Sequence, residues 1–595
     1  MRSIPLVLAC IHYKSATHRL PSPTLGSFDA EYESLEKRTS ANDELGPLLE
    51  LSHFTSYWRP DALKSLKGVL LSSSQISSFH IIQARRGTDV KASFQPRSGA
   101  PVLEGSENVA GMRLNTGPPA VKQRNLSSTR YSGPIDQVFL ESVSVLEGGR
   151  LLQGVHADLD HSLAARVLDM VPELADWESW YAPPPALTNG HVHTILAAKL
   201  RKTRAVKYHR ELLITPDGGT LALDSLVGMR RARSGADGTD WLSAASRSFL
   251  SSGAVAGANE DAQRSDTLFV DRLPPRDPNR PLLMLLSGLG GGSQDTYVRS
   301  MAATAAERGW QVVVLNMRAC GSSPVTSPRL FSARLGANDD VRFAVQHLRR
   351  SRLGNSTRLA VIGWSNSGTI LNNVLAEQAT THTDQSYAID AGVSLAAPLD
   401  MPASNRNIEK RPFHRQVYDR NLGKSLRNLW MRSRSQFVDS RTDLPIEVPL
   451  WDGLGEARGT FTADDELAKA GTSIRELDEA LTRRQYGFAS VDDYYADASS
   501  DQRLGQISTP LLCMNAYDDP MVPGSSLARG LTNARGNPNV IMAITLHGGH
   551  LGWCDPKTPW GSPSWIERTS LGFLEAVLDI KKADSCEIEA CEIFD

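Results

Sequence analysis

Short apolar runs alternate with segments of helical periodicity through the second half of the chain. The runs are continuous rather than alternating with polar residues, which is typical of strands buried on both faces of a sheet. Strands are predicted at 282–286, 312–315, 359–362, 391–395, 510–514 and 541–546. Helices are predicted between the first four of these runs, at 302–308, 337–350 and 368–377. This alternation predicts the α/β class, with a mostly parallel central sheet flanked by helices.

Three further segments differ from this alternation. Residues 212–214 and 220–224 are predicted as a hairpin around the turn Pro-Asp-Gly-Gly at 216–219. Residues from about 228 to 266 are rich in Ser, Ala, Gly and Arg, and they are predicted to form an insertion loop. Residues from about 400 to 505 are polar, aromatic and helical in pattern, and they stand where an α/β enzyme carries a cap.

The two ends of the chain have a different composition. Residues 1–160 are expected to form an N-terminal extension, partly disordered, because most of them are rich in Ser, Thr, Gly, Pro and Arg without a sustained period. The α/β domain is expected at 161–580, and 581–595 is expected to be an acidic, solvated tail. The first residues combine one Arg, a short apolar run and no acid, which is interpreted as a targeting segment or as a disordered leader.

Charge and composition exclude some classes of function. The 595 residues include 64 Lys and Arg and 66 Asp and Glu, a formal net charge of −2, so no nucleic-acid partner is expected. Six scattered cysteines have no metal-ligand spacing and are too sparse for a disulfide scaffold, which favours an intracellular, cytoplasmic location without fixing it. No apolar stretch reaches the ~18 residues of a transmembrane helix, although peripheral membrane contact through the cap or the leader stays open.

A serine stands at the apex of a predicted strand–turn–helix. The strand 359–362 runs into Gly-Trp-Ser-Asn-Ser-Gly at 363–368, with Ser365 at the bend. A nucleophilic serine needs such a tight turn, and the following helix directs amide donors at the site. The usual pattern is Gly-x-Ser-x-Gly, but here Ser367 takes the fifth position and Gly368 follows it. Alone, this pentapeptide is equally compatible with an ordinary turn between a strand and a helix.

A carboxylate and a histidine follow the serine in the order that a nucleophilic hydroxyl requires. Asp518 and Asp519 come directly after the strand 510–514, and His550 follows the strand 541–546 after two glycines. Each has an ordinary alternative, a surface turn for the acids and a loop position for the histidine. Their joint occurrence at strand ends favours a base and its orienting acid beside Ser365.

The third requirement is a pair of amide donors for the oxyanion. One is expected to be the N–H of Asn366, directly after the nucleophile, and the other the N–H of Leu289 in the glycine-rich turn 287–293. The competing interpretation of that turn is a dinucleotide or phosphate loop. It fails because Ser293 stands at the third glycine position and no Lys-Ser/Thr follows, so no cofactor is expected.

Several motifs spread along the chain carry a resemblance to a known family. They are NGHVHTI at 189–195, DGG at 217–219, SGLGGGS at 287–293, YVR at 297–299, NMRACG at 316–321, RLF at 329–331, NDD at 338–340, GFASVDDYY at 487–495 and HGGHLGW at 547–553. On these motifs the chain resembles the α/β-hydrolase family of bacterial YheT proteins, animal α/β-hydrolase-domain proteins 1, 2 and 3, and plant embryogenesis-associated proteins. The resemblance covers roughly 180–578, about two thirds of the chain.

The resemblance implies an α/β-hydrolase fold with a helical cap, here with a long N-terminal extension. Matched residue by residue, it assigns Ser365 as nucleophile, Asp519 as acid and His550 as base. Asp519 is preferred over Asp518 because it stands three residues after Ala516, which replaces the glycine of the usual Gly-x-x-Asp.

Three positions depart from the family pattern. Ser287 stands where many relatives have His, Ala319 replaces a glycine, and Ser367 replaces the last glycine of the serine turn. The expected fold is unaffected by these changes. They keep open the alternative of a catalytically silent binding protein with a hydrolase fold.

Two histidine patterns stand in the sequence, one near residue 191 and one near residue 550. His191 and His193 form a His-x-His pair, but they lack a third ligand nearby, so a structural role is favoured and no metal is expected. His550 and Asp555 form His-x4-Asp, a pattern linked to acyltransferases, which overlaps the predicted triad.

The resulting expectation is a serine hydrolase that cleaves carboxylic esters through an acyl-enzyme. The resemblance implies a small-molecule or lipid ester as substrate: a short- or medium-chain acyl ester, a monoacylglycerol or a phospholipid. An acyltransferase with an alcohol acceptor is the alternative enzyme. The cap's aromatic residues either line an acyl pocket or pack the core of the cap, the second being favoured for most of them; they are Phe413, Tyr418, Trp430, Phe437, Trp451 and Phe461.

Overall fold

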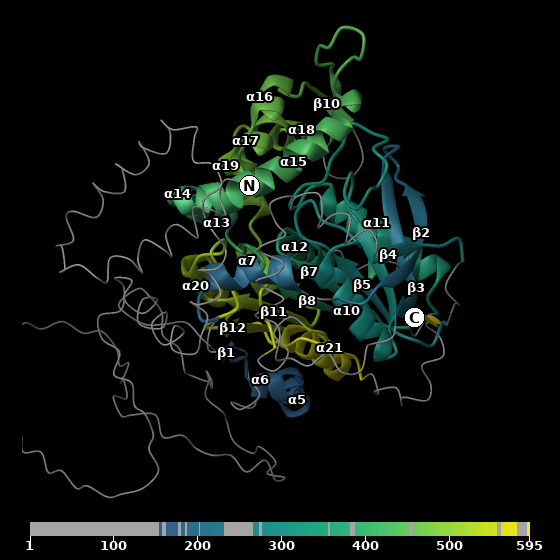
Figure 1. Ribbon diagram of the computed structural model, residues 1–595, viewed down its shortest axis with the longest axis vertical. Coiled ribbons are helices and arrows are strands. Elements are labelled where there is room, and N and C mark those ends of the chain that lie inside the picture. The colour runs from purple at the N-terminus through teal and green to yellow at the C-terminus, as the bar shows by residue number, and fades with distance from the viewer. Residues whose placement is uncertain are drawn as a thin grey trace, which may run out of the picture. The chain divides into compact units, whose positions relative to one another are not determined.

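The computed structural model of the protein has an α/β domain with a helical cap at one end (Figure 1). It describes residues 154–156, 162–175, 180–184, 187–201, 203–230, 266–272, 277–354, 357–380, 387–451, 457–555, 561–579 and 592–594. Most of the predicted extension and most of the predicted tail lie outside these ranges. Within the described parts, no helix is long and apolar enough to cross a bilayer.

Six parallel strands form the centre of an 11-stranded sheet. In spatial order they are β12 (Val540–Thr545), β11 (Leu511–Ala516), β8 (Ala391–Leu395), β7 (Leu359–Trp364), β5 (Leu282–Leu286) and β6 (Gln311–Asn316). All six apolar runs predicted from the sequence are therefore strands. Because the strands are parallel, their carboxyl ends meet at one edge of the sheet, where ligands bind in such folds.

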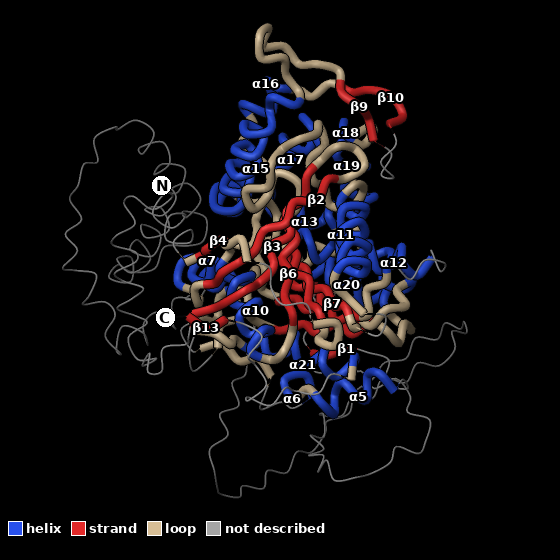
Figure 2. The backbone as a smooth tube through the Cα atoms, turned by 90° about the vertical axis from the view of Figure 1, so that its right-hand side faces the viewer, coloured by secondary structure: helices blue, strands red, loops and turns tan. Residues whose placement is uncertain are grey.

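Helices cover both faces of this sheet, and the side chains of each strand divide between the two layers (Figure 2). In β5, Leu282, Met284 and Leu286 pack into one core cluster, while Leu283 and Leu285 pack into the other. The first layer contains α11 (Ala337–Ser351), α12 (Asn366–Thr380) and α20 (Gly524–Ala534). The second contains α5 (Ser162–Met170), α6 (Pro172–Ala175), α10 (Thr296–Glu307) and α21 (Trp565–Leu578).

The predicted hairpin is present and longer than expected. It consists of β2 (Val206–Ile214) and β3 (Thr220–Arg230), and β3 continues the sheet antiparallel to β6. The strand residues Gly228, Met229 and Arg230 were expected to start the insertion loop, so that boundary was wrong. Residues 231–265 of the loop lie outside the described residues, and β4 (Thr267–Phe269) then pairs with β2.

Two three-residue strands lie beyond the expected domain boundaries. β1 (Gly154–His156), expected in the extension, pairs antiparallel with β12, and β13 (Glu592–Phe594), expected in the solvated tail, pairs with β3. Main-chain pairing needs no particular side chain, and three residues are too few to show a period. These contacts therefore left no signal in the sequence.

The cap occupies the segment between β8 and β11 and is mostly helical, as predicted. Its elements are α13 (Met401–Lys410), α14 (Pro412–His414), η4 (Arg415–Asp419), α15 (Arg420–Ser433), η5 (Arg434–Gln436), α16 (Asp465–Ala470), α17 (Ile474–Leu477), η6 (Asp478–Thr482), α18 (Arg483–Gln485), α19 (Val491–Ala498) and η7 (Asp501–Gln506). A small hairpin of β9 (Val448–Trp451) and β10 (Ala457–Phe461), missed by the sequence analysis, is inserted among them. Two of the cap's turns, η4 and η6, are π-helical, and such turns are frequent at functional sites.

A buried ion-pair network joins three of the family-like motifs. The Arg318 guanidinium donates to both oxygens of Asp340 at 2.8 Å and to Asp217 at 2.8 Å, and all three side chains are nearly inaccessible. Burial raises the pKa of Asp217, but the hydrogen bonds from Arg318 outweigh this effect and bring the pKa down to about 2. The network thus ties the β2–β3 turn to the segment after β6 and to α11.

Replacing the cation of this network is expected to destabilise the fold strongly. Arg318→Met leaves two buried carboxylates without their partner, and we expect the free energy of unfolding to fall by about 3 to 5 kcal/mol. Urea unfolding measures the loss, with Arg350→Met on the exposed end of α11 as the matched control, expected within about 0.5 kcal/mol of wild type. A loss below about 1 kcal/mol for Arg318→Met would show that the network contributes little.

Candidate functional site

Ser365 lies at the sharp turn between β7 and α12. Its φ of 53° falls in the left-handed region, where non-glycine residues are uncommon. The turn is held by the Ser365 N–H, which donates to the Leu395 carbonyl at 2.8 Å. A Cβ on Gly363 would lie 2.3 Å from the Ser367 carbonyl oxygen, and one on Gly368 would lie 2.8 Å from Ser394 Oγ, so the turn requires glycine at both positions.

The three residues predicted for the triad come together at the carboxyl edge of the sheet. His550 Nε2 lies 2.9 Å from Ser365 Oγ, and His550 Nδ1 lies 2.8 Å from Asp519 Oδ2. Asp519 and His550 are buried, whereas Ser365 keeps partial exposure. The hydrogen-bond path therefore runs from a buried carboxylate to a hydroxyl that a ligand can reach.

Backbone and side-chain groups hold the acid and the base in place. Asp519 Oδ1 accepts the N–H of Met521 at 2.7 Å and that of Val522 at 3.1 Å, which leaves Oδ2 for the imidazole. The His550 N–H donates to Thr194 Oγ1 at 2.8 Å. Thr194 belongs to α7 (Gly190–Leu200), so the first family-like motif supports the histidine loop.

The neighbouring carboxylate makes a separate set of contacts. Asp518 Oδ1 accepts the Gly549 N–H at 2.8 Å, and Asp518 Oδ2 lies 3.2 Å from His547 Nδ1. Asp518 thus orders the loop that carries His550, while Asp519 contacts the His550 ring.

Two turns bring Leu289 and Asn366 to the cavity that holds Ser365. Leu289 and Asn366 both line the same cavity as Ser365 and His550, and Asn366 is the first residue of α12, so its N–H has no partner within the helix. The Gly288 N–H is already used, because it donates to the Tyr297 hydroxyl at 2.9 Å. Both residues expected to supply the oxyanion amides therefore line the cavity that holds Ser365.

Two of the departures from the family pattern contact each other. The Ser367 hydroxyl donates to the Ser287 carbonyl, which fastens the serine turn to the turn after β5. Tyr297 and Asp295 fix the other side of the latter turn, since the Tyr297 hydroxyl donates to Asp295 at 2.8 Å. Neither Tyr297 nor Thr194 is predicted from the sequence to take part in the site, although both stand within family-like motifs.

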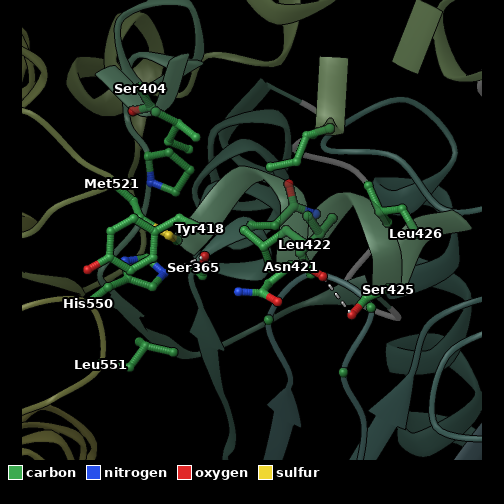
Figure 3. A pocket seen from close by; sticks show the side chains of 18 of the residues that line it. Ser365, Ser404, Tyr418, Asn421, Leu422, Ser425, Leu426, Met521, His550 and Leu551 are labelled. Atoms are coloured by element: carbon green, nitrogen blue, oxygen red, sulfur yellow. Dashed lines mark hydrogen bonds between the residues drawn. The ribbon is translucent and has the colours of Figure 1, made fainter. Parts of the chain in front are cut away.

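A cavity of about 1090 Å³ opens above Ser365 and His550 and extends into the cap (Figure 3). Its cap end is walled by buried apolar side chains from several helices; among them are Leu426, Leu429, Trp430, Leu477 and Leu481. Of the six aromatic residues singled out in the cap, Tyr418 and Trp430 line the cavity, and Phe437 and Phe461 pack in the core. Such a volume and lining suit an apolar acyl chain.

The two histidines of the His-x-His pair make separate contacts. His191 Nδ1 lies 2.8 Å from the Tyr418 hydroxyl and joins α7 to the cap, whereas His193 Nε2 lies 3.5 Å from Cys554 Sγ. Burial lowers the pKa of His191 to about 4 and that of His193 to about 3, so both are neutral near pH 7. Within the described ranges, no group of three His, Cys, Asp or Glu side chains is arranged to hold a metal ion.

The cavity wall also holds a carboxyl group with an altered pKa. Asp478, in the π-helical turn η6, accepts the Tyr495 hydroxyl at 2.8 Å, and burial raises its pKa from the ordinary 3.8 to about 6. At neutral pH this carboxylate is therefore held ionised at an energetic cost.

The chain is similar in sequence to a known protein family and to several named proteins. Residues 281–553 match the family model described as alpha/beta hydrolase fold. The chain is 33% identical over 396 residues to embryogenesis-associated protein EMB8 of Picea glauca, covering 66% of this chain and 71% of that protein. Over 295 residues it is 30% identical to medium-chain fatty acid ethyl ester synthase/esterase 2 of Saccharomyces cerevisiae, covering 49% of this chain and 62% of that protein. Over 390 residues it is 27% identical to monoacylglycerol lipase of the same yeast, covering 64% of this chain and 78% of that protein.

The raised pKa of Asp478 predicts a pH-dependent effect of removing its charge. The folded state binds the Asp478 proton more tightly than the unfolded state, so the stability this provides is present below the ordinary pKa of 3.8 and is lost as the pH rises through about 6. Asp478→Asn keeps an acceptor for Tyr495 without the charge. Relative to wild type, we expect its free energy of unfolding to rise by about 2 to 3 kcal/mol between about pH 4 and about pH 8. Urea unfolding at both pH values tests this, and a difference that does not change with pH would contradict it.

Proposed function

The chain belongs to the α/β-hydrolase family, and from this membership we propose that it is a serine hydrolase that cleaves carboxylic esters. The observation that carries the proposal is the hydrogen-bond path from Asp519 through His550 to Ser365, which ends at an apolar cavity. A hydroxyl becomes nucleophilic when a base accepts its proton and a carboxylate orients that base.

In the proposed reaction, Ser365 Oγ attacks the ester carbonyl while His550 Nε2 accepts the hydroxyl proton. Asp519 accepts the Nδ1–H bond and stabilises the imidazolium that forms. The N–H groups of Leu289 and Asn366 donate to the developing oxyanion. The imidazolium then protonates the leaving alcohol, and His550 activates a water that hydrolyses the acyl-enzyme. Every step uses side chains or amides of this chain.

The lining of the cavity supports lipid-like esters as the substrate class. Burying each methylene of an acyl chain contributes about 0.8 kcal/mol, so a wall of leucines and Trp430 favours acyl chains over polar acids. The yeast relative's name, monoacylglycerol lipase, agrees with this class. The candidates are short- and medium-chain acyl esters, monoacylglycerols and phospholipids.

A second candidate activity is transfer of the acyl group to an alcohol. It is favoured by the name of the yeast ethyl ester synthase/esterase and by the overlap of His550 and Asp555 with an acyltransferase pattern. The first half-reaction is the same, and an alcohol replaces water in the second. Product analysis of a medium-chain acyl ester turned over with and without ethanol separates the two activities.

The triad predicts labelling by a fluorophosphonate probe that depends on one serine. We expect the wild-type protein to be labelled and Ser365→Ala to be unlabelled, with kcat/KM for ester hydrolysis reduced by at least about 10⁴-fold. Ser351→Ala, on the exposed end of α11, is the control and should label like wild type.

The labelling experiment also decides between the enzyme and the silent binding protein. Absence of labelling in folded wild-type protein would favour the silent alternative. Labelling that persists in Ser365→Ala would move the nucleophile to another residue and contradict the proposal.

The cap end of the cavity predicts the preference for acyl length. Leu481→Phe adds bulk to the wall, so we expect kcat/KM for a ten-carbon acyl ester to fall by about tenfold while that for a four-carbon ester changes by less than about twofold. Leu531→Phe, a partly buried leucine of α20 outside the cavity, is the matched control. An equal fall for both esters would show that the acyl chain does not reach Leu481.

A further inference from the structure

The first part of the cap carries a concentration of positive charge. Residues 401–436 contain nine basic and two acidic residues, a local excess of seven positive charges in a chain whose formal charge is −2. The basic residues are Arg406, Lys410, Arg411, Arg415, Arg420, Lys424, Arg427, Arg432 and Arg434. They belong to α13, η4, α15 and the turns that flank them, and they are called the basic cap face below.

Most of these cations have no carboxylate within ion-pair distance among the described residues. All but Arg434 are exposed, and among the residues that the structure describes only Arg434 of the nine forms ion pairs, with Asp443 and Asp465. Within the described ranges, the hydrogen bonds of Arg415, Arg427 and Arg432 go to backbone carbonyls. Exposed cations without partners add little to folding stability, so their concentration in one segment points to a partner outside the chain.

The helix α15 arranges part of this charge in one stripe. At 100° per residue, Arg420, Lys424 and Arg427 point to the same side, together with Met431, which is 49% exposed. Other sides of the helix bury Leu426, Leu429 and Trp430, which line the cavity, and Leu429 lies directly opposite the stripe. A helix with a basic outer face and an exposed apolar residue is typical of segments that lie on anionic membrane surfaces.

The cavity opens beside this stripe. Asn421 and Ser425 of α15 are exposed and also line the cavity (Figure 3). The exposed residues Lys424 of α15 and Lys199 at the end of α7 line it as well. The described acids of the lining, Asp295 and Asp478, are engaged with Tyr297 and Tyr495. The rim of the cavity is therefore positively charged, while its inner wall is apolar.

We propose that the basic cap face docks the protein on an anionic lipid surface, with the mouth of the cavity turned toward that surface. A lipid ester then passes from the surface into the cavity without crossing bulk water. The choice of a lipid surface over another polyanion rests on the proposed lipid-ester function and on the near-neutral charge of the chain as a whole.

Vesicle co-sedimentation of the full chain tests the docking apart from catalysis. The protein carries Ser365→Ala, so no lipid is consumed, and the vesicles are phosphatidylcholine with or without roughly one third phosphatidylserine. The test variant adds Arg415→Gln, Arg420→Gln and Arg427→Gln, none of which lines the cavity. The control variant adds Arg350→Gln, Arg358→Gln and Arg535→Gln, three exposed arginines outside the basic cap face.

The expected result is binding that needs anionic lipid and weakens with added salt. Each lost charge is expected to weaken binding roughly fivefold, so the test variant binds on the order of a hundredfold less tightly. The control variant is expected to bind like the protein with only Ser365→Ala. Equal binding by test and control variants, or binding to neutral vesicles alone, would overturn the proposal.

Two further arms separate the possible failures. Binding to duplex RNA that depends on the basic cap face and exceeds binding to anionic vesicles would replace the lipid surface by a nucleic acid. With native Ser365, the protein carrying Arg415→Gln, Arg420→Gln and Arg427→Gln is expected to hydrolyse a water-soluble short-chain ester at the wild-type rate. If no ester is turned over but vesicle binding still depends on the basic cap face, the proposed function fails and the docking surface stands.

Discussion

The left-handed backbone at Ser365 is the constraint on which the site depends. A residue with a Cβ adopts this conformation at a cost of about 1 to 2 kcal/mol, and it persists only where its surroundings fix it. Here the fixing contacts are the Ser365 N–H bond to Leu395 and the close packing around Gly363 and Gly368. The bend lifts the hydroxyl above the sheet edge, where His550 reaches it. A relaxed turn would direct the side chain elsewhere, and neither Asp519 nor the cavity could compensate.

Much of this arrangement could be predicted because the strands of a parallel sheet leave a readable signal. β5 and β8 match their predicted bounds, since continuous apolar runs between turns have few alternative interpretations. Once β7, β11 and β12 are known to be parallel, Ser365, Asp519 and His550 must stand at one edge, although they are far apart in sequence. The choice of Asp519 over Asp518 came from the family motif alone. Both are close enough to the edge that spacing does not separate them.

The features that the sequence did not predict depend on contacts between distant segments. The hairpin of β9 and β10 lies in a stretch of mixed composition, and β1 and β13 are held by main-chain bonds that any residue can make. The bond from Ser367 to Ser287 is another case. Considered separately, Ser287 and Ser367 each replace a residue that is usual in the family. Together they form a hydrogen bond that connects the two turns carrying the expected oxyanion amides. This coupling argues that the site keeps its shape despite both changes.

The cap helix α15 presents buried apolar side chains toward the cavity and exposed basic side chains toward solvent. The inner side of α15 gains stability from burying Leu426, Leu429 and Trp430, which is sufficient reason for the helix to pack where it does. The outer side gains nothing comparable, because Arg420, Lys424 and Arg427 are exposed and make no ion pair with a described carboxylate. Folding therefore accounts for the apolar stripe but not for the basic one. The apolar and basic stripes of α15 meet at the rim of the cavity, at Lys424. We therefore infer that the basic stripe contacts the partner that approaches the cavity from solvent.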